Sequence, residues 1–254
     1  MRNVLLMACI IACNTVAHAQ QLAWEPSPRQ PFVSPSKFVA VELSVGLAMH
    51  NARLPYLEDL YQIPCCTYEE GVSMPVTGLM SFESWILPTV ALQGCIGIRT
   101  ETASFSTTPT SLPRVLQPDV QTQYQMQCQS SWLILGVGGK HRLMKTPLTI
   151  GGSISGLMLM HSSMTHREVI LGPDDYFFVT DPPSKEYELP TASLSDVRGF
   201  VVRPALAVTY DVPLSAGYYV SPSLKLETII GSLSQKHSWS SYGVSLGVSL
   251  ARGL

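Results

Sequence analysis

The most constraining feature of this chain is a strict alternation close to its C-terminus. From Tyr242 to Leu250 every even position is Tyr, Val or Leu, and every odd position is Gly or Ser. Because a β-strand points successive side chains to opposite faces, the segment predicts a strand with one apolar face and one nearly bare face. A strand of a soluble sandwich usually carries larger polar side chains on its wet face. Small residues instead favour the crowded inside of a narrow barrel.

The composition agrees with such a barrel lying in a membrane. Charged residues make up only 13% of the chain and hydrophobic residues 46%, whereas soluble domains have about 25% charged residues. Past the N-terminus there is no uninterrupted apolar run near the roughly 18 residues that a membrane-spanning helix needs. The apolar surplus therefore lies in short alternating pieces, which is typical of strands that cross an outer membrane as a closed barrel. The net charge of -2 and the lack of a Lys/Arg-rich run predict no nucleic-acid partner.

The N-terminus has the pattern of an export signal. Residues 1–19 combine a basic start at Arg2, an apolar segment over 4–12 and the small-x-small site Ala17-His18-Ala19. We expect cleavage after Ala19; the alternative is a lipoprotein signal that would lipidate Cys13. Residues 20–36, rich in Pro, are then an extended lead-in, and residues 37–254 form the barrel.

Seven further segments alternate like the last one, so we predict an all-β, eight-stranded antiparallel up-and-down transmembrane barrel. The expected strands cover about 39–49, 74–86, 90–101, 121–137, 148–164, 202–212, 220–231 and 240–254. Long loops are expected over 51–72, 105–120 and 170–194, and they alternate with short turns near 88, 140–147 and 213–217. This order fits an outer-membrane barrel with both termini in the periplasm and its long loops outside. Aromatic residues near strand ends would mark the membrane interfaces: Tyr210, Tyr218, Tyr219, Trp239 and Tyr242.

The charged residues of these strands share the face that carries Gly and Ser. A soluble barrel such as a lipocalin would place its charges outside, so this parity puts them in the interior. Since eight strands leave room for side chains rather than for an open pore, we expect a lumen charge network of Glu42, Glu83, Arg99, Arg203, Lys225 and Glu227. The alternative is a narrow path for protons or small ions.

Four cysteines remain in the mature chain. An exported protein meets an oxidising compartment, so disulfides are expected rather than metal ligation. Cys65 and Cys66 can bridge each other or pair elsewhere, and Cys95 with Cys128 can form a cross-strand disulfide or remain as two buried thiols. No cofactor is expected.

The chain resembles the N-terminal barrel of OmpA-like outer-membrane proteins over about residues 37–254. The segment Ile63-Pro64-Cys65-Cys66, followed by Glu69, Glu70 and Gly71, is similar to a stretch in barrels of the Bacteroidetes and Chlorobi type. The last strand resembles the assembly signal that the barrel-assembly machinery reads, through Tyr242, Gly247, Leu250 and Leu254. That signal normally ends on an aromatic residue, and Leu254 departs from it. The OmpA family also binds peptidoglycan through a domain that follows the barrel, and we do not expect that anchoring for residues 37–254.

The resemblance implies a protein of a Gram-negative outer membrane that contacts lipid and lipopolysaccharide. We expect a structural or surface-interaction role in which the external loops bind an extracellular ligand. The alternatives are a narrow channel and a lipid-modifying enzyme, for which the local His/Ser groups are candidates: His161, Ser162, Ser163 and His166, and more weakly His237, Ser238 and Ser240. An enzymatic role is not the preferred interpretation.

Overall fold

The computed structural model describes residues 36–63, 65–113, 119–143, 146–190, 196–215 and 217–254. Within these ranges the chain forms twelve strands and one short helix, α2 (Tyr56–Tyr61). The strands are β1 (Lys37–Leu54), β2 (Tyr68–Ser73), β3 (Val76–Leu87), β4 (Val90–Ser106), β5 (Thr110–Leu112), β6 (Val120–Arg142), β7 (Leu148–Gly172), β8 (Glu186–Glu188), β9 (Phe200–Tyr210), β10 (Val212–Ser215), β11 (Tyr218–Thr228) and β12 (Ser238–Gly253). The expected signal peptide, residue 13 and all but the last residue of the lead-in lie outside the described ranges.

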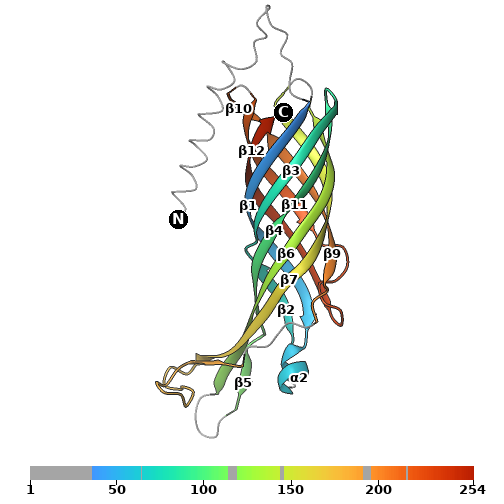
Figure 1. Ribbon diagram of the computed structural model, residues 1–254. Coiled ribbons are helices and arrows are strands. Elements are labelled where there is room, and N and C mark those ends of the chain that lie inside the picture. Colours follow the sequence, from blue (N-terminus) through green and yellow to red (C-terminus); the bar gives the residue numbers. More distant parts are fainter. Residues whose placement is uncertain (1–35, 64, 114–118, 144–145, 191–195, 216) are drawn as a thin grey trace, which may run out of the picture.

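Eight of the strands close into a barrel (Figure 1). Around the barrel the order is β1, β3, β4, β6, β7, β9, β11 and β12, and every neighbouring pair is antiparallel. Closure comes from β12, which pairs with β1 from Phe38↔Gly253 to Arg53↔Ser238. The eight-stranded antiparallel order expected from the sequence is therefore confirmed. Each barrel strand pairs with the next one along the chain, which leaves the barrel without an edge.

The two faces of the barrel wall differ as the alternation predicts. Outward apolar side chains are exposed, for example Val41 at 58%, Leu43 at 62% and Leu246 at 65%. Their neighbours point inward and are small or polar, such as Ser44 and Ser245, which are buried. Gly247 shows how crowded the inside is, since a Cβ there would lie 2.8 Å from Ser223 Oγ.

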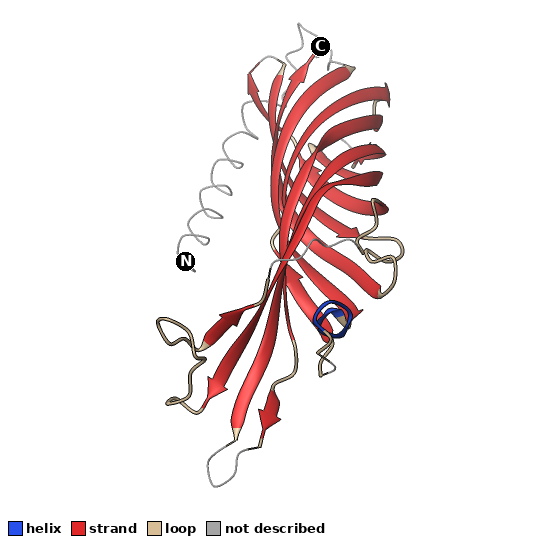
Figure 2. Cartoon of the chain, turned by 60° about the horizontal axis from the view of Figure 1, so that its bottom comes forward, coloured by secondary structure: helices blue, strands red, loops and turns tan. Residues whose placement is uncertain are grey.

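The two ends of the barrel are built differently (Figures 1 and 2). At one end, here called the terminal end, β1 starts, β12 ends, and short connections such as residues 88–89 join the strands. The other end, here called the α2 end, carries the helix and the longer connections. There β6 and β7 continue well past the other strands, and β5 and β8 pair with them.

Three predicted loops contain regular structure instead. The segment 51–72 holds the end of β1, α2 and most of β2; the segment 105–120 holds β5; and the segment 170–194 holds β8. The two longest strands, β6 and β7, also run past their expected ends at residues 137 and 164. The extra residues of β6 lie at the terminal end, where β6 pairs with the start of β4. Those of β7 lie at the α2 end, where the parity of the pattern inverts.

In that region the barrel is apolar inside and polar outside. On β1, Ala52 and Leu54 are buried while Asn51 and Arg53 are exposed. On β6, the buried Met126 lies between two partly exposed glutamines. A strand prediction that relies on apolar outward residues therefore stops before the real end of the strand. These strand ends have polar outward and apolar inward residues, as in a soluble barrel.

The helix α2 has six residues. No helix in the described ranges is long and apolar enough to cross a membrane.

Candidate functional site

The charged side chains inside the barrel form compact ion pairs. Arg99 donates to Glu101 at 3.1 Å and to Glu227 at 2.5 Å, and Arg203 donates to the second oxygen of Glu227 at 3.1 Å. The side chains of Arg99 and Glu227 are only 5% and 8% exposed. Each carboxylate thus compensates a guanidinium that burial would otherwise destabilise strongly.

Two further pairs lie in the lumen. Lys225 donates to Glu42, and Lys140 donates to Glu83 at 2.5 Å. Glu83 is therefore inside the barrel as expected, but its partner is Lys140 and not another member of the predicted set. Lys140 belongs to β6, where the sequence predicted a turn.

The described lumen pairs balance in charge. Arg99, Arg203, Lys225 and Lys140 face Glu101, Glu227, Glu42 and Glu83, four of each sign. Sequence reasoning left out Glu101 and Lys140, although Glu101 already lay on the predicted inward face. These paired groups together carry no net charge that would favour the passage of one sign of ion.

Apolar side chains fill the barrel at the α2 end. Trp132, Ile134 and Leu157 are each 2% exposed or less, and they belong to one buried cluster with Leu54 and Tyr68. This cluster has the character of a soluble protein core, and it follows from the inverted parity of the strand ends.

The helix α2 is fixed over this apolar cluster. Tyr56 and Leu57 are buried in it. The Tyr56 hydroxyl donates to Asp196 at 3.0 Å, and Asp59 pairs with His237 at 2.9 Å. Burial opposes ionisation of Asp196, but hydrogen bonds from Ser234 and Tyr56 outweigh it and hold the pKa of that carboxyl below its usual range.

A histidine that the sequence analysis did not single out lies between Trp239 and Ser73. His50 Nε2 is 2.8 Å from Ser73 Oγ, and the indole N–H of Trp239 donates to His50 Nδ1 at 3.1 Å. Because an indole nitrogen only donates, Nδ1 is the acceptor and Nε2 carries the proton that is given to Ser73. In this tautomer His50 cannot take a proton from Ser73, so the pair is structural. Trp239, expected at a membrane interface, is instead 5% exposed and inside the barrel.

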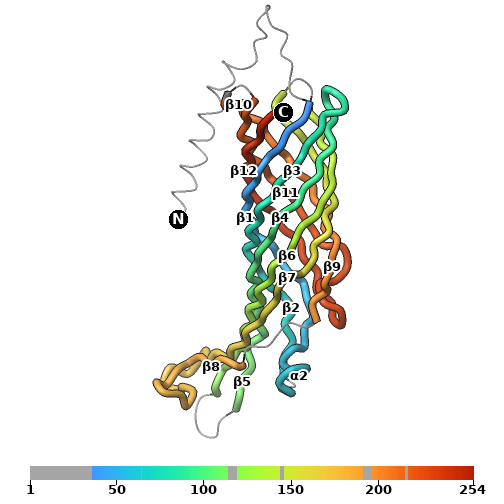
Figure 3. The backbone as a smooth tube through the Cα atoms, in the orientation of Figure 1, coloured from blue at the N-terminus to red at the C-terminus, as the bar shows by residue number. Residues whose placement is uncertain are grey.

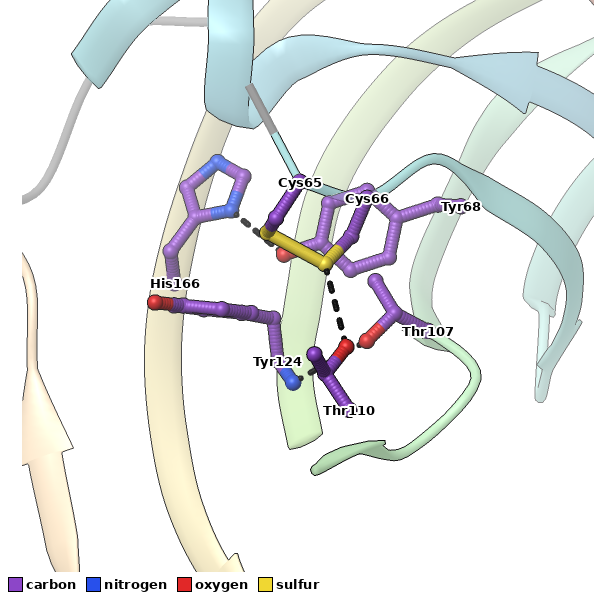
Figure 4. The surroundings of a disulfide bond; sticks show 7 residues. All are labelled: Cys65, Cys66, Tyr68, Thr107, Thr110, Tyr124 and His166. Carbon is purple, nitrogen blue, oxygen red and sulfur yellow. Dashed lines mark hydrogen bonds between the residues drawn. A yellow bond between two sulfur atoms is a disulfide. The ribbon is translucent and has the colours of Figure 1, made fainter. Parts of the chain in front are cut away.

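A vicinal disulfide joins Cys65 and Cys66 beside this core (Figure 4). Cys66 Sγ contacts Thr110 Oγ1 at 3.7 Å, so the disulfide links the β1–β2 connection to β5. Close by, His166 Nδ1 lies 3.1 Å from the Tyr68 hydroxyl and its Nε2 contacts Met164 Sδ at 3.2 Å. Burial of His166 lowers its pKa to about 4.

Of the two alternatives for Cys95 and Cys128, the disulfide is wrong, because both thiols are free. In the β4–β6 register Cys95 lies opposite Gly136, while Cys128 lies opposite Ala103. The sequence placed both on inward faces, but the long β6 shifts them to different levels of the barrel. Burial raises the pKa of Cys128 to about 12.

Two of the predicted His/Ser candidates, His166 and His237, contact side chains other than serine. The two ring nitrogens of His166 contact Tyr68 and Met164. His237 binds Asp59, and the Ser240 hydroxyl donates to the carbonyl of Asn51. His161 is exposed on the outer side of β7. Within the described ranges no three His, Cys, Asp or Glu side chains lie close enough to hold a metal ion.

The residues of the expected assembly signal lie on β12 and at its end. Tyr242, Leu250 and Leu254 are exposed at 55%, 53% and 68%. Gly247 faces the lumen instead, where a Cβ would lie 2.9 Å from Glu42 Oε1. The glycine therefore has a packing role beside the Glu42–Lys225 pair.

No protein-family model matches the chain, and no curated protein matches it in sequence. Among solved structures it is similar to the outer-membrane protein AlkL, with 9% identity, a TM-score of 0.40, and coverage of 92% of this chain and 98% of that one. The outer-membrane protease OmpT of Escherichia coli has 8% identity, a TM-score of 0.38, and coverage of 90% and 100%. Neisserial surface protein A has 8% identity, a TM-score of 0.30, and coverage of 85% and 97%. These neighbours are outer-membrane proteins of differing roles, and none supplies a site for this chain.

Proposed function

We propose that the chain is an integral outer-membrane barrel of a Gram-negative bacterium that acts through its α2 end. The observation that carries the proposal is the outward apolar band. On β1 the exposed apolar side chains run from Val39 to Met49 and end where the outward positions become Asn51 and Arg53. Eleven residues of a strand tilted by about 40° span roughly 25 Å, the height of the apolar band of outer-membrane barrels.

This band needs a bilayer. Around the barrel every strand contributes to it, for example Met80, Ile96, Val137, Ile154 and Leu226, all at least half exposed. A continuous apolar belt of this size is unfavourable in water. We infer that the terminal end, with its short connections, faces the periplasm and the α2 end faces the outside. Export would use the expected signal peptide at residues 1–19.

The contents of the barrel favour a surface role over a channel. The balanced ion pairs occupy the middle of the lumen, and the apolar cluster beneath α2 occupies its outer part. A path for ions would have to cross that cluster, where charges are costly.

The experiment that tests the membrane proposal is heat modifiability. Outer membranes are isolated, solubilised in detergent, and run on a gel with and without boiling. We expect the protein in the outer-membrane fraction and a faster unboiled form. A freely soluble protein with unchanged mobility would refute the proposal.

Conductance separates the surface role from the channel. The purified protein is added to planar bilayers and the current is recorded. The comparison variant is Trp132→Gly/Ile134→Gly/Leu157→Gly, which removes three large side chains from the apolar cluster. We expect no current steps from the wild type. Regular steps from the wild type would show that the lumen conducts and would overturn the surface role.

A further inference from the structure

Beyond the barrel, β6 and β7 extend as a small sheet with two free sides, here called the arm (Figures 2 and 3). Its order is β5, β6, β7 and β8, with β5 at Thr110–Leu112 and β8 at Glu186–Glu188. Within the described ranges β5 pairs only with β6, and β8 pairs only with β7. The arm therefore has open edges that the barrel lacks.

The connection between β7 and β8, and β8 itself, hold apolar side chains in the solvent. Phe177, Val179 and Tyr187 are exposed at 46%, 106% and 47%; with Tyr176 they are called the aromatic patch. The connection is folded, because the Phe178 amide donates to the Ser184 carbonyl at 2.8 Å. This patch lies beyond the outward apolar band, so the bilayer of the proposed function does not cover it. Exposed apolar patches of this kind mark interaction surfaces.

The patch already holds one cation of its own chain. Lys185 Nζ lies 5.8 Å from the centre of the Phe177 ring and 2.8 Å from Asp174 Oδ1. An ammonium between an aromatic face and a carboxylate is a favourable arrangement. The same chemistry is available to a cation from a partner.

The net charge of the arm favours a partner of the opposite charge. Residues 167–188 contain six carboxylates and two basic side chains, which gives a net charge of -4. Both bases are engaged, Arg167 with Glu186 and Lys185 with Asp174. No described ion pair involves Asp175, Asp181 or Glu188. An anionic lipid surface, a phosphorylated glycan and a second copy of this arm would all be repelled, whereas a cationic partner is attracted.

The backbone of β8 offers a place for a strand. The Lys185 carbonyl accepts from Ile170 and the Leu189 amide donates to His166, so odd positions face β7. The backbone groups of Glu186 and Glu188 then point to the open side. Ser184 Oγ accepts from the Glu186 amide at 3.0 Å. Among the described residues, the Glu186 carbonyl and both backbone groups of Glu188 then remain for a partner.

We propose that the open edge of β8 binds an extended peptide segment that carries Lys or Arg. The segment adds a strand to the arm, and its basic side chains reach Asp175, Asp181 and Glu188 while resting on the aromatic patch. This inference deepens the proposed function, on which it rests, since it names the class of ligand for the external surface.

The test uses the full chain refolded in nanodiscs of a zwitterionic lipid. The probe is a short fluorescent peptide that alternates Lys and Thr, and binding is followed by fluorescence polarisation at low salt. Two control peptides replace Lys by Glu, or methylate alternate amide nitrogens while keeping every charge. The variant is Asp175→Asn/Asp181→Asn/Glu188→Gln, and its matched control is Glu69→Gln/Glu70→Gln, which removes exposed carboxylates from β2.

We expect the Lys peptide to bind, the Glu peptide not to bind, and the methylated peptide to bind at least several-fold more weakly. The triple variant should weaken binding roughly tenfold, as the loss of three exposed charge contacts implies; the β2 control should not. Equal binding of the methylated peptide, or an equal effect of the β2 control, would leave only a diffuse charge effect and overturn the inference. If the protein bound the uncharged oligosaccharide maltoheptaose and did not bind the Lys peptide, the inference would also be overturned. Heat modifiability of the same preparation reports the barrel without any peptide, so failure of the proposed function is seen separately.

Discussion

Glu227 is the side chain on which the lumen network depends most directly. Each of its two oxygens accepts from a different guanidinium, Arg99 at 2.5 Å and Arg203 at 3.1 Å. The substitution Glu227→Gln keeps the shape of the side chain and removes the negative charge. Arg99, Arg203 and Glu101 would then carry a net charge of +1 in a region where the side chains are less than a tenth exposed.

Removing one partner of a buried ion pair costs roughly 3–5 kcal/mol, because the other charge stays buried without compensation. We therefore expect the free energy of unfolding to fall by about that amount. The assay is urea unfolding of the barrel in lipid vesicles, followed by gel mobility without boiling and by tryptophan fluorescence.

The matched control is Glu186→Gln, whose partner Arg167 lies on the surface with 34% of its side chain exposed. Such a pair contributes about 0–1 kcal/mol. A second variant, Glu227→Gln/Arg203→Met, removes one positive charge together with the negative one and should recover part of the loss. Two results would contradict the compensating role of the network. One is a loss of unfolding free energy in Glu227→Gln no larger than that in Glu186→Gln. The other is a double variant that loses more unfolding free energy than Glu227→Gln and Arg203→Met do together.

Three further predictions follow from the same structure. Leu43→Arg, on the outward face and 62% exposed, should cost about 2–4 kcal/mol of unfolding free energy in vesicles, and Asn51→Arg, outside the apolar band, about 0–1 kcal/mol; equal costs would contradict the band. Burial lowers the pKa of His166 to about 4 in the folded protein, against about 6.5 in the unfolded chain. Below pH 6.5 the unfolded chain therefore binds a proton that the folded protein does not bind. The free energy of unfolding falls as the pH drops towards 4, and at pH 5 the loss is about 2 kcal/mol. Wild type should therefore lose that much more stability between pH 7.5 and pH 5 than His166→Gln, whereas the exposed His161→Gln should behave like the wild type; an unchanged pH dependence in His166→Gln would argue against a buried neutral His166. Finally, Cys128 is 2% exposed and its pKa is raised to about 12, so it should resist maleimide labelling in the folded protein and react after denaturation. Cys65 and Cys66 should react only after reduction of their disulfide. Detection of a disulfide-linked Cys95–Cys128 peptide by mass spectrometry would refute the strand register.

Along the outward apolar band, local pattern was enough to predict the strands. On β1 and β12 the alternation of apolar with small residues identified strand, face and pairing partner, and the structure shows them closed against each other. Near the α2 end the same rule failed, because the outside becomes polar and the inside apolar. The end of β7, and the strands β2, β5 and β8, were therefore expected as loops.

The candidate site divides in a similar way. Inward parity alone selected Glu42, Arg99 and Glu227, but parity does not tell which strands face each other across the lumen. The Lys140–Glu83 pair and the contact of His50 with Trp239 join residues from strands far apart in the chain. Glu101 lies on the same strand as Arg99, two residues along. Likewise the inward position of Cys95 and Cys128 was consistent with a disulfide until the register separated them.

The sequence by itself determined the alternation, the strand number and the two faces of the wall, because these depend on neighbours along the chain. Only the tertiary structure decided the depth at which each side chain sits, the pairing of the lumen charges, the fixing of α2 over an apolar core, and the free edge of β8. These properties depend on strand register and on the lengths of neighbouring strands, so no single segment contains them.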